Sequence, residues 1–281
     1  MGAPENEFLA LGLQRQAYAK MRVGAGKLAD GILYALGAFM VVYFVPTILT
    51  YVFNAGLQNT EQQISPTLAL FDPFAALAYL TVGLMLSWLW IALFFGMIAL
   101  TYRIADRIID GADLIHKGMT QLSHIGAPGP GPFDKGGRAL MLGAGIMVLT
   151  SVPFAFAALP GNPLGSLGFF IVQLVMDIAF ALIAVGLITL GVAFWRCGSA
   201  CGQGDVKEGG AAIVVGMVIF LLSWGTILAF QLNLVTMPLR PGLAALLFPV
   251  LAPALPAYCV LGFITAYIGI RKAFIGIRRL V

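Results

Sequence analysis

An aspartate stands in the middle of one of the most apolar stretches of the chain. Asp177 lies in FFIVQLVMDIAFALIAVGL, and Gln173 precedes it by four residues, a spacing that puts both side chains on one face of a helix. An ionised carboxylate at the centre of a bilayer costs about 2.5–3.5 kcal/mol on insertion scales. We therefore expect this face to point into a helical bundle or at another subunit rather than at lipid.

Two chemical roles fit Asp177. It would bind a proton or a cation as the coupling site of a transporter, or it would join helices as a hydrogen-bonded, uncharged group. No lysine or arginine lies at a matching depth in another apolar stretch, so the sequence predicts no ion pair within the chain for Asp177. Both roles stay open at this point.

Three prolines interrupt the last apolar stretch, PGLAALLFPVLAPALPAYCVLGF. Pro249, Pro253 and Pro256 follow steps of four and three residues, which places them on one helical face. Each proline lacks an N–H group and clashes with the carbonyl group four residues earlier. The pattern predicts a kinked, broken or re-entrant segment, which would be either a helix break with a gating role or a packing irregularity.

The cysteines and histidines do not make a convincing metal site. Cys197 and Cys201 form a C-x₃-C pair, whereas zinc takes four ligands and commonly uses C-x₂-C. His116 and His124 lie in a different loop and would have to complete such a site. We therefore predict no metal.

Known signatures of cofactor binding and catalysis are also missing. No apolar stretch contains a histidine, so haem or pigment ligation within the membrane is not expected. No phosphate-binding loop, dinucleotide fingerprint, nucleophile elbow or HExxH motif occurs. We predict no cofactor and no catalytic residue, which disfavours an enzyme.

The elements that would position these residues are membrane helices. Of the 281 residues, 60% are hydrophobic and 10% are charged, against about 25% charged in a typical soluble domain. A membrane-spanning helix needs about 20 apolar residues, and six stretches qualify. They are residues 31–53, 74–102, 139–159, 167–194, 211–232 and 243–270.

The distribution of basic residues sets the orientation of these spans. Of the 16 lysines and arginines, all but Arg240 lie in the N-terminal segment, in the second and fourth connections, or in the C-terminal tail. The positive-inside rule then places both termini in the cytoplasm. Because the charges are spread over four segments beside membrane ends, no nucleic-acid surface is predicted. We expect a bacterial inner (cytoplasmic) membrane, with an organellar membrane as the alternative.

The cytoplasmic segments are expected to contain amphipathic helices. Between residues 102 and 122, apolar residues fall on one face, at Ile104, Ile108, Ala112, Ile115, Met119 and Leu122. A second amphipathic piece lies around residues 8–21. Both would dock on the membrane surface or bind a partner. No internal repeat is evident.

We thus predict an all-α polytopic membrane protein with six transmembrane helices. Its organisation is an N-terminal amphipathic segment, the first two spans, an amphipathic helix with a Pro/Gly loop, four further spans and a basic tail. These correspond to residues 1–30, 31–101, 102–138, 139–270 and 271–281.

Two functional hypotheses follow. The first is a subunit of a larger membrane assembly for transport, secretion or energy coupling, mainly structural or pore-forming. Its partners would be the lipid bilayer and other membrane subunits or further copies of itself. The second is a self-contained, ion-coupled transporter or channel that uses Asp177 and the proline-broken sixth span.

Overall fold

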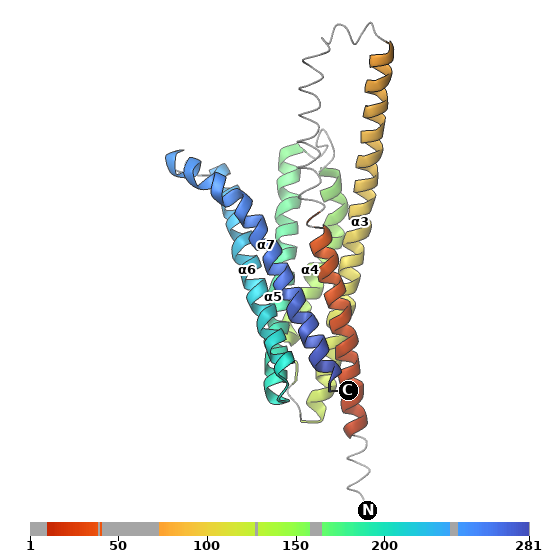
Figure 1. The fold of residues 1–281 in the computed structure, drawn as a ribbon, viewed down its shortest axis with the longest axis vertical. Coiled ribbons are helices and arrows are strands. Elements are labelled where there is room, and N and C mark those ends of the chain that lie inside the picture. Colours follow the sequence, from red (N-terminus) through yellow and green to blue (C-terminus); the bar gives the residue numbers. More distant parts are fainter. Residues whose placement is uncertain are drawn as a thin grey trace, which may run out of the picture.

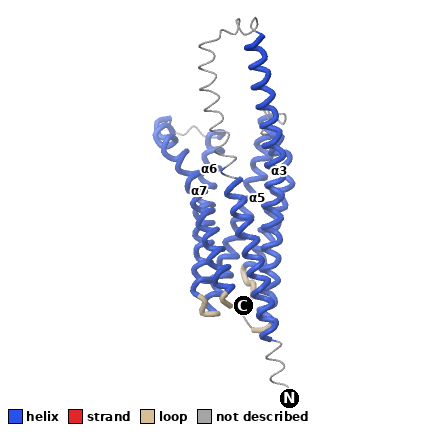
Figure 2. The backbone as a smooth tube through the Cα atoms, turned by 45° about the vertical axis from the view of Figure 1, so that its right-hand side comes forward, coloured by secondary structure: helices blue, strands red, loops and turns tan. Residues whose placement is uncertain are grey.

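The computed structural model describes residues 10–38, 40, 73–126, 129–157, 165–236 and 241–280. Within these residues every regular element is a helix, and the helices run alongside one another in an elongated bundle (Figures 1 and 2). The helices are residues 10–38 (helix 10–38), α3 (Pro73–His124), α4 (Phe133–Ala157), α5 (Gly165–Ala200), α6 (Gly204–Thr236) and α7 (Pro241–Arg278).

Four helices are long and apolar enough to cross a membrane. These segments correspond to the third to sixth predicted spans, and they are Phe133–Phe154, Phe170–Ala200, Gly204–Ala229 and Ala254–Arg278. The first predicted span leaves the described residues after residue 40, and the second, 74–102, forms the first part of α3. The all-helical class is confirmed, and the four segments indicate an integral membrane protein. The six-span topology stays a prediction.

The amphipathic face predicted within α3 is present, but it packs against another helix of the chain instead of a membrane surface. All six of its apolar residues, from Ile104 to Leu122, are buried. They share one core cluster with Tyr18, Met21 and Leu28 of helix 10–38, which continues without a break past residue 30. The two apolar faces therefore pack together inside the chain instead of docking on a membrane surface, because mutual contact removes both from water.

The described helices form three antiparallel pairs (hairpins) that approach closely at glycines. The first hairpin joins helix 10–38 to α3, the second joins α4 to α5, and the third joins α6 to α7. In each, a Cβ atom on a glycine of the second helix would lie within 3 Å of a carbonyl oxygen of the first, so only glycine permits this backbone contact. The distances are 2.8 Å from Gly111 to Gly24, 2.7 Å from Gly186 to Gly136, and 2.7 Å from Gly269 to Gly209.

The three hairpins close into a ring. Contacts between one hairpin and the next occur within about two helical turns of the glycine contacts within the hairpins, and the last hairpin returns to the first. These joining contacts are the His116–Asp134 pair between α3 and α4, Gly191 against Gly210 between α5 and α6, and Arg22 over the ring of Phe274 between helix 10–38 and α7.

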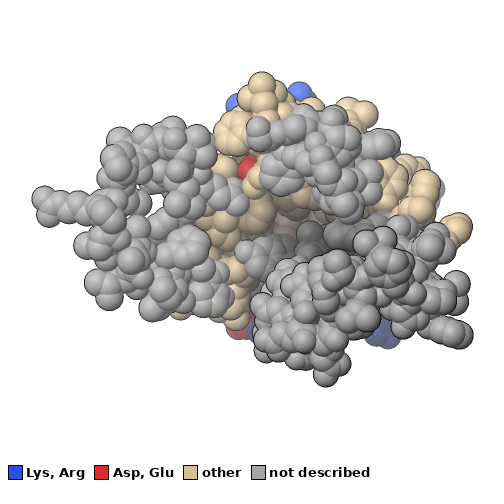
Figure 3. All heavy atoms as spheres, turned by 90° about the horizontal axis from the view of Figure 1, so that it is seen from above, with Lys and Arg blue, Asp and Glu red and all other residues tan. Residues whose placement is uncertain are grey.

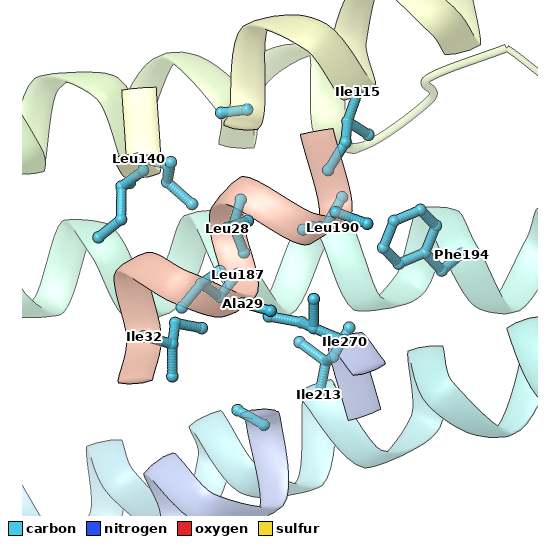
Figure 4. Close-up of a cluster of buried hydrophobic side chains, with 14 of the residues drawn as sticks. Leu28, Ala29, Ile32, Ile115, Leu140, Leu187, Leu190, Phe194, Ile213 and Ile270 are labelled. Atoms are coloured by element: carbon cyan, nitrogen blue, oxygen red, sulfur yellow. The ribbon is translucent and has the colours of Figure 1, made fainter. Parts of the chain in front are cut away.

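The hairpins repeat one structural pattern, which corrects the expectation that the chain has no internal repeat. Each first helix carries a glycine, a second small residue and another glycine seven positions after the first: Gly24, Ala25 and Gly31; Gly136, Gly137 and Gly143; Gly209, Gly210 and Gly216. Four residues after the first glycine comes a buried aliphatic residue, and these three gather in the core in Figure 4: Leu28, Leu140 and Ile213. Only small residues and apolar spacing are shared, so a comparison by residue identity does not reveal the repeat.

Candidate functional site

Asp177 lies where the sequence predicts it, in the interior of the bundle. Its side chain is 5% exposed, and it is the one carboxylate or basic side chain among the buried residues that the structure describes. The contact of Gly191 with Gly210 fixes the antiparallel register of α5 and α6. In this register Asp177 reaches the level of Trp224, because each lies fourteen residues from its glycine, towards the same end of the bundle.

The polar atoms of this pair are left without good partners. The indole N–H of Trp224 faces the carboxyl group, yet no hydrogen bond of proper geometry joins them. Asp177 Oδ2 and Trp224 Nε1 are each buried without a hydrogen-bond partner. An unsatisfied buried polar group costs about 1–3 kcal/mol, so a small movement that completes the Asp177–Trp224 bond would be favourable.

Packing holds the indole of Trp224 in place. Its ring centroid lies 5.4 Å from that of Phe180 on α5, edge to face, and 5.9 Å from that of Phe220 on α6, stacked. The ring centroid of Phe220 in turn lies 4.7 Å from that of Phe263 on α7. These aromatic contacts join three helices next to Asp177, and the sequence alone gave no signal that Trp224 belongs to the site.

Gln173 stands one turn before Asp177 on α5 and is partly buried. The shared face that the spacing predicts is therefore present on the helix. None of the ion pairs among the described residues includes Asp177.

The centre of the ring contains a small apolar cavity. It measures about 20 Å³, room for one water molecule. All six described helices line it with apolar side chains, and the residues eleven positions after the first glycine of each repeat are among them: Ala35, Met147 and Phe220. The alanine of the first hairpin is much smaller than the methionine and phenylalanine at equivalent positions, which accounts for the empty space.

The three prolines of the sixth predicted span all belong to α7. Pro256 is buried, and the side chains of Pro249 and Pro253 lie outside those that the structure describes. The first part of α7 bends away from the bundle in Figure 1. The prolines and Asp177 are on different helices, so the structure does not join them into one site.

The cysteines and histidines do not come together in one cluster within the described part of the chain. The hydroxyl group of Tyr18 lies 3.4 Å from Cys201 Sγ, and burial raises the pKa of Tyr18 to about 12, so the hydroxyl stays protonated. His116 pairs with Asp134 at 2.7 Å. Among the residues that the structure describes, no three His, Cys, Asp or Glu side chains are grouped to hold a metal ion.

Comparison with known proteins adds no relative. No family model, no curated protein and no solved structure matches this chain.

Proposed function

We propose that this chain is an integral membrane subunit of a larger membrane assembly and that its role there is mainly structural. The observation that carries the proposal is the apolar centre of the helical ring. The space that the described residues enclose there has room for about one water molecule, and its lining offers no polar group to such a molecule. Among the described residues, the interior therefore favours a scaffold over a conduit for ions or polar solutes.

The outer surface supports an embedded subunit. Leu149 on α4 is 78% exposed and Leu222 on α6 is 68% exposed, as expected for side chains that face lipid tails. Such apolar residues are spread along α4, α5, α6 and α7. Contact with other membrane proteins would use part of the same surface.

The charge distribution supports an inner-membrane orientation with both termini in the cytoplasm. Helix 10–38 begins and α7 ends at the same end of the bundle (Figure 1). The opposite end, viewed in Figure 3, presents mostly uncharged described side chains. The basic residues Arg196 and Arg278 belong to the end with the termini, which fits the positive-inside rule.

A flux assay tests the scaffold. The purified full-length protein is reconstituted into liposomes, and ion and proton leakage is compared with that of protein-free liposomes. We expect no protein-dependent flux. A saturable flux would contradict the scaffold proposal.

A second function is favoured by one specific observation. Asp177 is buried, and its Oδ2 atom has no hydrogen-bond partner. A carboxyl group of this kind suits the coupling site of an ion- or proton-driven transporter, with the proline-containing α7 as a moving element. In the flux assay this candidate predicts a pH-dependent flux that Asp177→Asn abolishes.

A further inference from the structure

Four exposed basic side chains lie on α4, α5 and α6 towards the end of the bundle where both termini lie. None of them belongs to an ion pair among the described residues. They form what we call the basic patch: Lys135 and Arg138 on α4, Arg196 on α5 and Lys207 on α6. Ammonium and guanidinium groups without a carboxylate partner keep their hydrogen-bond donors available for an anion.

Close packing of α4 on α5 fixes the height of the first two bases. A Cβ atom on Gly136 would clash with the side chain of Thr189, so these two residues lie side by side. Lys135 and Arg138 flank Gly136 on α4 and therefore reach the level of the α5 turn that contains Thr189.

The other two bases are brought close to the first pair by glycine contacts at the end of α5. A Cβ atom on Gly131 would lie 3.4 Å from Arg196 Nη1, so the guanidinium group of Arg196 reaches the start of α4. Gly198, two residues after Arg196, packs against the backbone nitrogen of Lys207. In this register all four bases lie within about three helical turns of one another in height.

The acidic residues that adjoin these bases in the sequence are paired with side chains of other helices. One pairs with α3 and two pair with α7, which border other sides of the ring. These pairs are Asp134 with His116, Asp205 with Arg279, and Glu208 with Lys272. Because their charges are already balanced, the basic patch keeps an excess of positive charge.

Several bases on the other sides of the ring are already engaged within the chain. Two form ion pairs on the first hairpin, and two lie over aromatic rings of α7. These contacts are Lys27 with Asp110, Lys117 with Asp113, Arg22 over Phe274 and Arg271 over Tyr267. The basic patch has no such internal partners among the described residues, so it is better suited to an external anion.

Farther from the termini, the same helices present aliphatic side chains on the outside. On α5, Val185 and Ile178 precede Arg196 by eleven and eighteen residues, close to whole numbers of helical turns, so all three share one face. On α4, Leu142 follows Arg138 by one turn. Val185, Ile178 and Leu142 are exposed, and we call them the apolar column.

We infer that the basic patch and the apolar column together bind an anionic phospholipid. The phosphate group would lie on the bases, where arginine can donate two parallel hydrogen bonds to it, and the acyl chains would lie along the apolar column. A lipid matches both parts because positive charge meets the apolar surface at one end only, as in other basic sites for lipid headgroups between membrane helices. The inference needs helices embedded in a membrane and does not depend on the proposed role as a subunit.

Lipid binding by the purified full-length protein tests the inference. The protein is stripped of lipid in detergent and mixed with phosphatidylglycerol or with phosphatidylcholine of the same acyl chains, and native mass spectrometry counts the lipids that stay bound. We expect preferential retention of phosphatidylglycerol, since the two lipids differ in net charge. Equal retention of both lipids would overturn the inference.

Two matched double variants locate the site. Arg138→Gln with Arg196→Gln should reduce the retention of phosphatidylglycerol severalfold. Arg103→Gln with Lys117→Gln removes two exposed positive charges from α3 and should leave retention unchanged. Equal losses in the two variants would mean that net charge, rather than the basic patch, attracts the lipid.

Conservative variants keep the test decisive if the glutamine variants fold poorly. Arg138→Lys with Arg196→Lys preserves both charges and should retain much more phosphatidylglycerol than the glutamine pair. If the lysine pair, at an unchanged midpoint of thermal unfolding, loses as much lipid as the glutamine pair unfolded or not, positive charge at these positions does not hold the lipid.

Competition distinguishes the lipid from other anionic ligands. A large molar excess of inorganic phosphate should leave phosphatidylglycerol bound, because free phosphate makes no contact with the apolar column. Displacement by phosphate would assign the patch to a free anion. Loss of a co-purifying acidic protein from the Arg138→Gln and Arg196→Gln variant, with lipid retention unchanged, would assign it to a protein partner. Either result would overturn the inference.

The inference and the proposed function fail separately. A chain that purifies without other membrane proteins and still retains phosphatidylglycerol through Arg138 and Arg196 would support the lipid site and contradict the role as a subunit. A stable complex with other membrane proteins that shows no preference for phosphatidylglycerol would do the reverse.

Discussion

At the scale of single residues, Asp177 is the position where the chemistry of this chain is least ordinary. It lies between α5 and α6, beside the indole of Trp224, which two aromatic contacts hold in place. Asp177 has no ion-pair partner among the described residues, so the neutral carboxyl group is the form that suits its burial. A neutral carboxyl can both donate and accept hydrogen bonds across the seam.

Two substitutions at Asp177 distinguish a structural role from ion coupling. Asp177→Asn keeps the size and the hydrogen-bonding ability of a neutral carboxyl, so we expect the amount of folded protein to remain unchanged. Asp177→Leu removes the acceptor that a small movement would bring within reach of Trp224 Nε1, so that N–H group stays unsatisfied and the protein should be destabilised by about 1–3 kcal/mol. Fluorescence-detected size exclusion after heating measures both effects.

The outcome that contradicts the structural role is specific. If Asp177→Asn retains the folded amount and the thermal stability but loses a protein-dependent flux, the carboxyl group titrates during function. The second candidate function would then replace the first.

The sequence located Asp177 but not its surroundings. Its burial was predictable, because a carboxyl group in a long apolar helix is too costly to leave in lipid. Trp224 was not predictable, because its place beside Asp177 depends on the antiparallel register that Gly191 and Gly210 set between two helices. That register is a property of packing rather than of either helix alone.

At the scale of elements, glycines determine how closely the helices approach. Gly216 on α6 faces α7, where an added Cβ atom would lie 2.6 Å from the carbonyl oxygen of Gly262. Gly225, on the same helix, has open space around it. The two positions therefore form a matched pair.

Valine substitutions test the close helix contact. Gly216→Val must push α6 and α7 apart, since the obstructing atom belongs to the backbone, and should lower the midpoint of thermal unfolding by several degrees. Gly225→Val should change it little. Equal midpoints for the two variants in detergent would show that α6 and α7 do not approach in this way.

A substitution that fills the central cavity is predicted to raise the midpoint of thermal unfolding, whereas Gly216→Val lowers it. Ala35→Val adds two methyl groups towards about 20 Å³ of empty space, and burial of each contributes up to about 0.8 kcal/mol. We expect a higher midpoint of thermal unfolding, whereas Ala92→Val at an exposed helical position serves as the control. A lower midpoint for Ala35→Val alone would mean that the cavity is already filled.

The spacing of apolar residues predicted the helices better than it predicted which surfaces they pack against. The apolar face of α3 was found residue by residue, because a step of three or four residues is a local signal. Its packing against helix 10–38 was not predicted: the piece around residues 8–21 was expected to dock on the membrane surface or bind a partner, since nothing local distinguishes an apolar face that meets lipid headgroups from one that meets another helix.

At the scale of the whole molecule, the chain is a ring of three related hairpins whose outer surface is uneven. All three hairpins expose apolar side chains, and α3 of the first hairpin also exposes the charged residues Arg103, Asp106 and Asp110. The repeat is hard to recognise in the sequence because it consists of small residues at seven-residue spacing, set among side chains of which only a few, such as Leu28 and Leu140, match between copies. A chain with this surface is expected to have protein neighbours in the membrane.

The native mass of the tagged full-length protein, extracted in mild detergent with everything that co-purifies identified, tests the proposed function most directly. We predict a reproducible complex that contains other membrane proteins together with the 29.8 kDa chain. Recovery of this chain by itself, as a monomer or a homodimer with no other protein, would contradict the role as a subunit of a larger assembly.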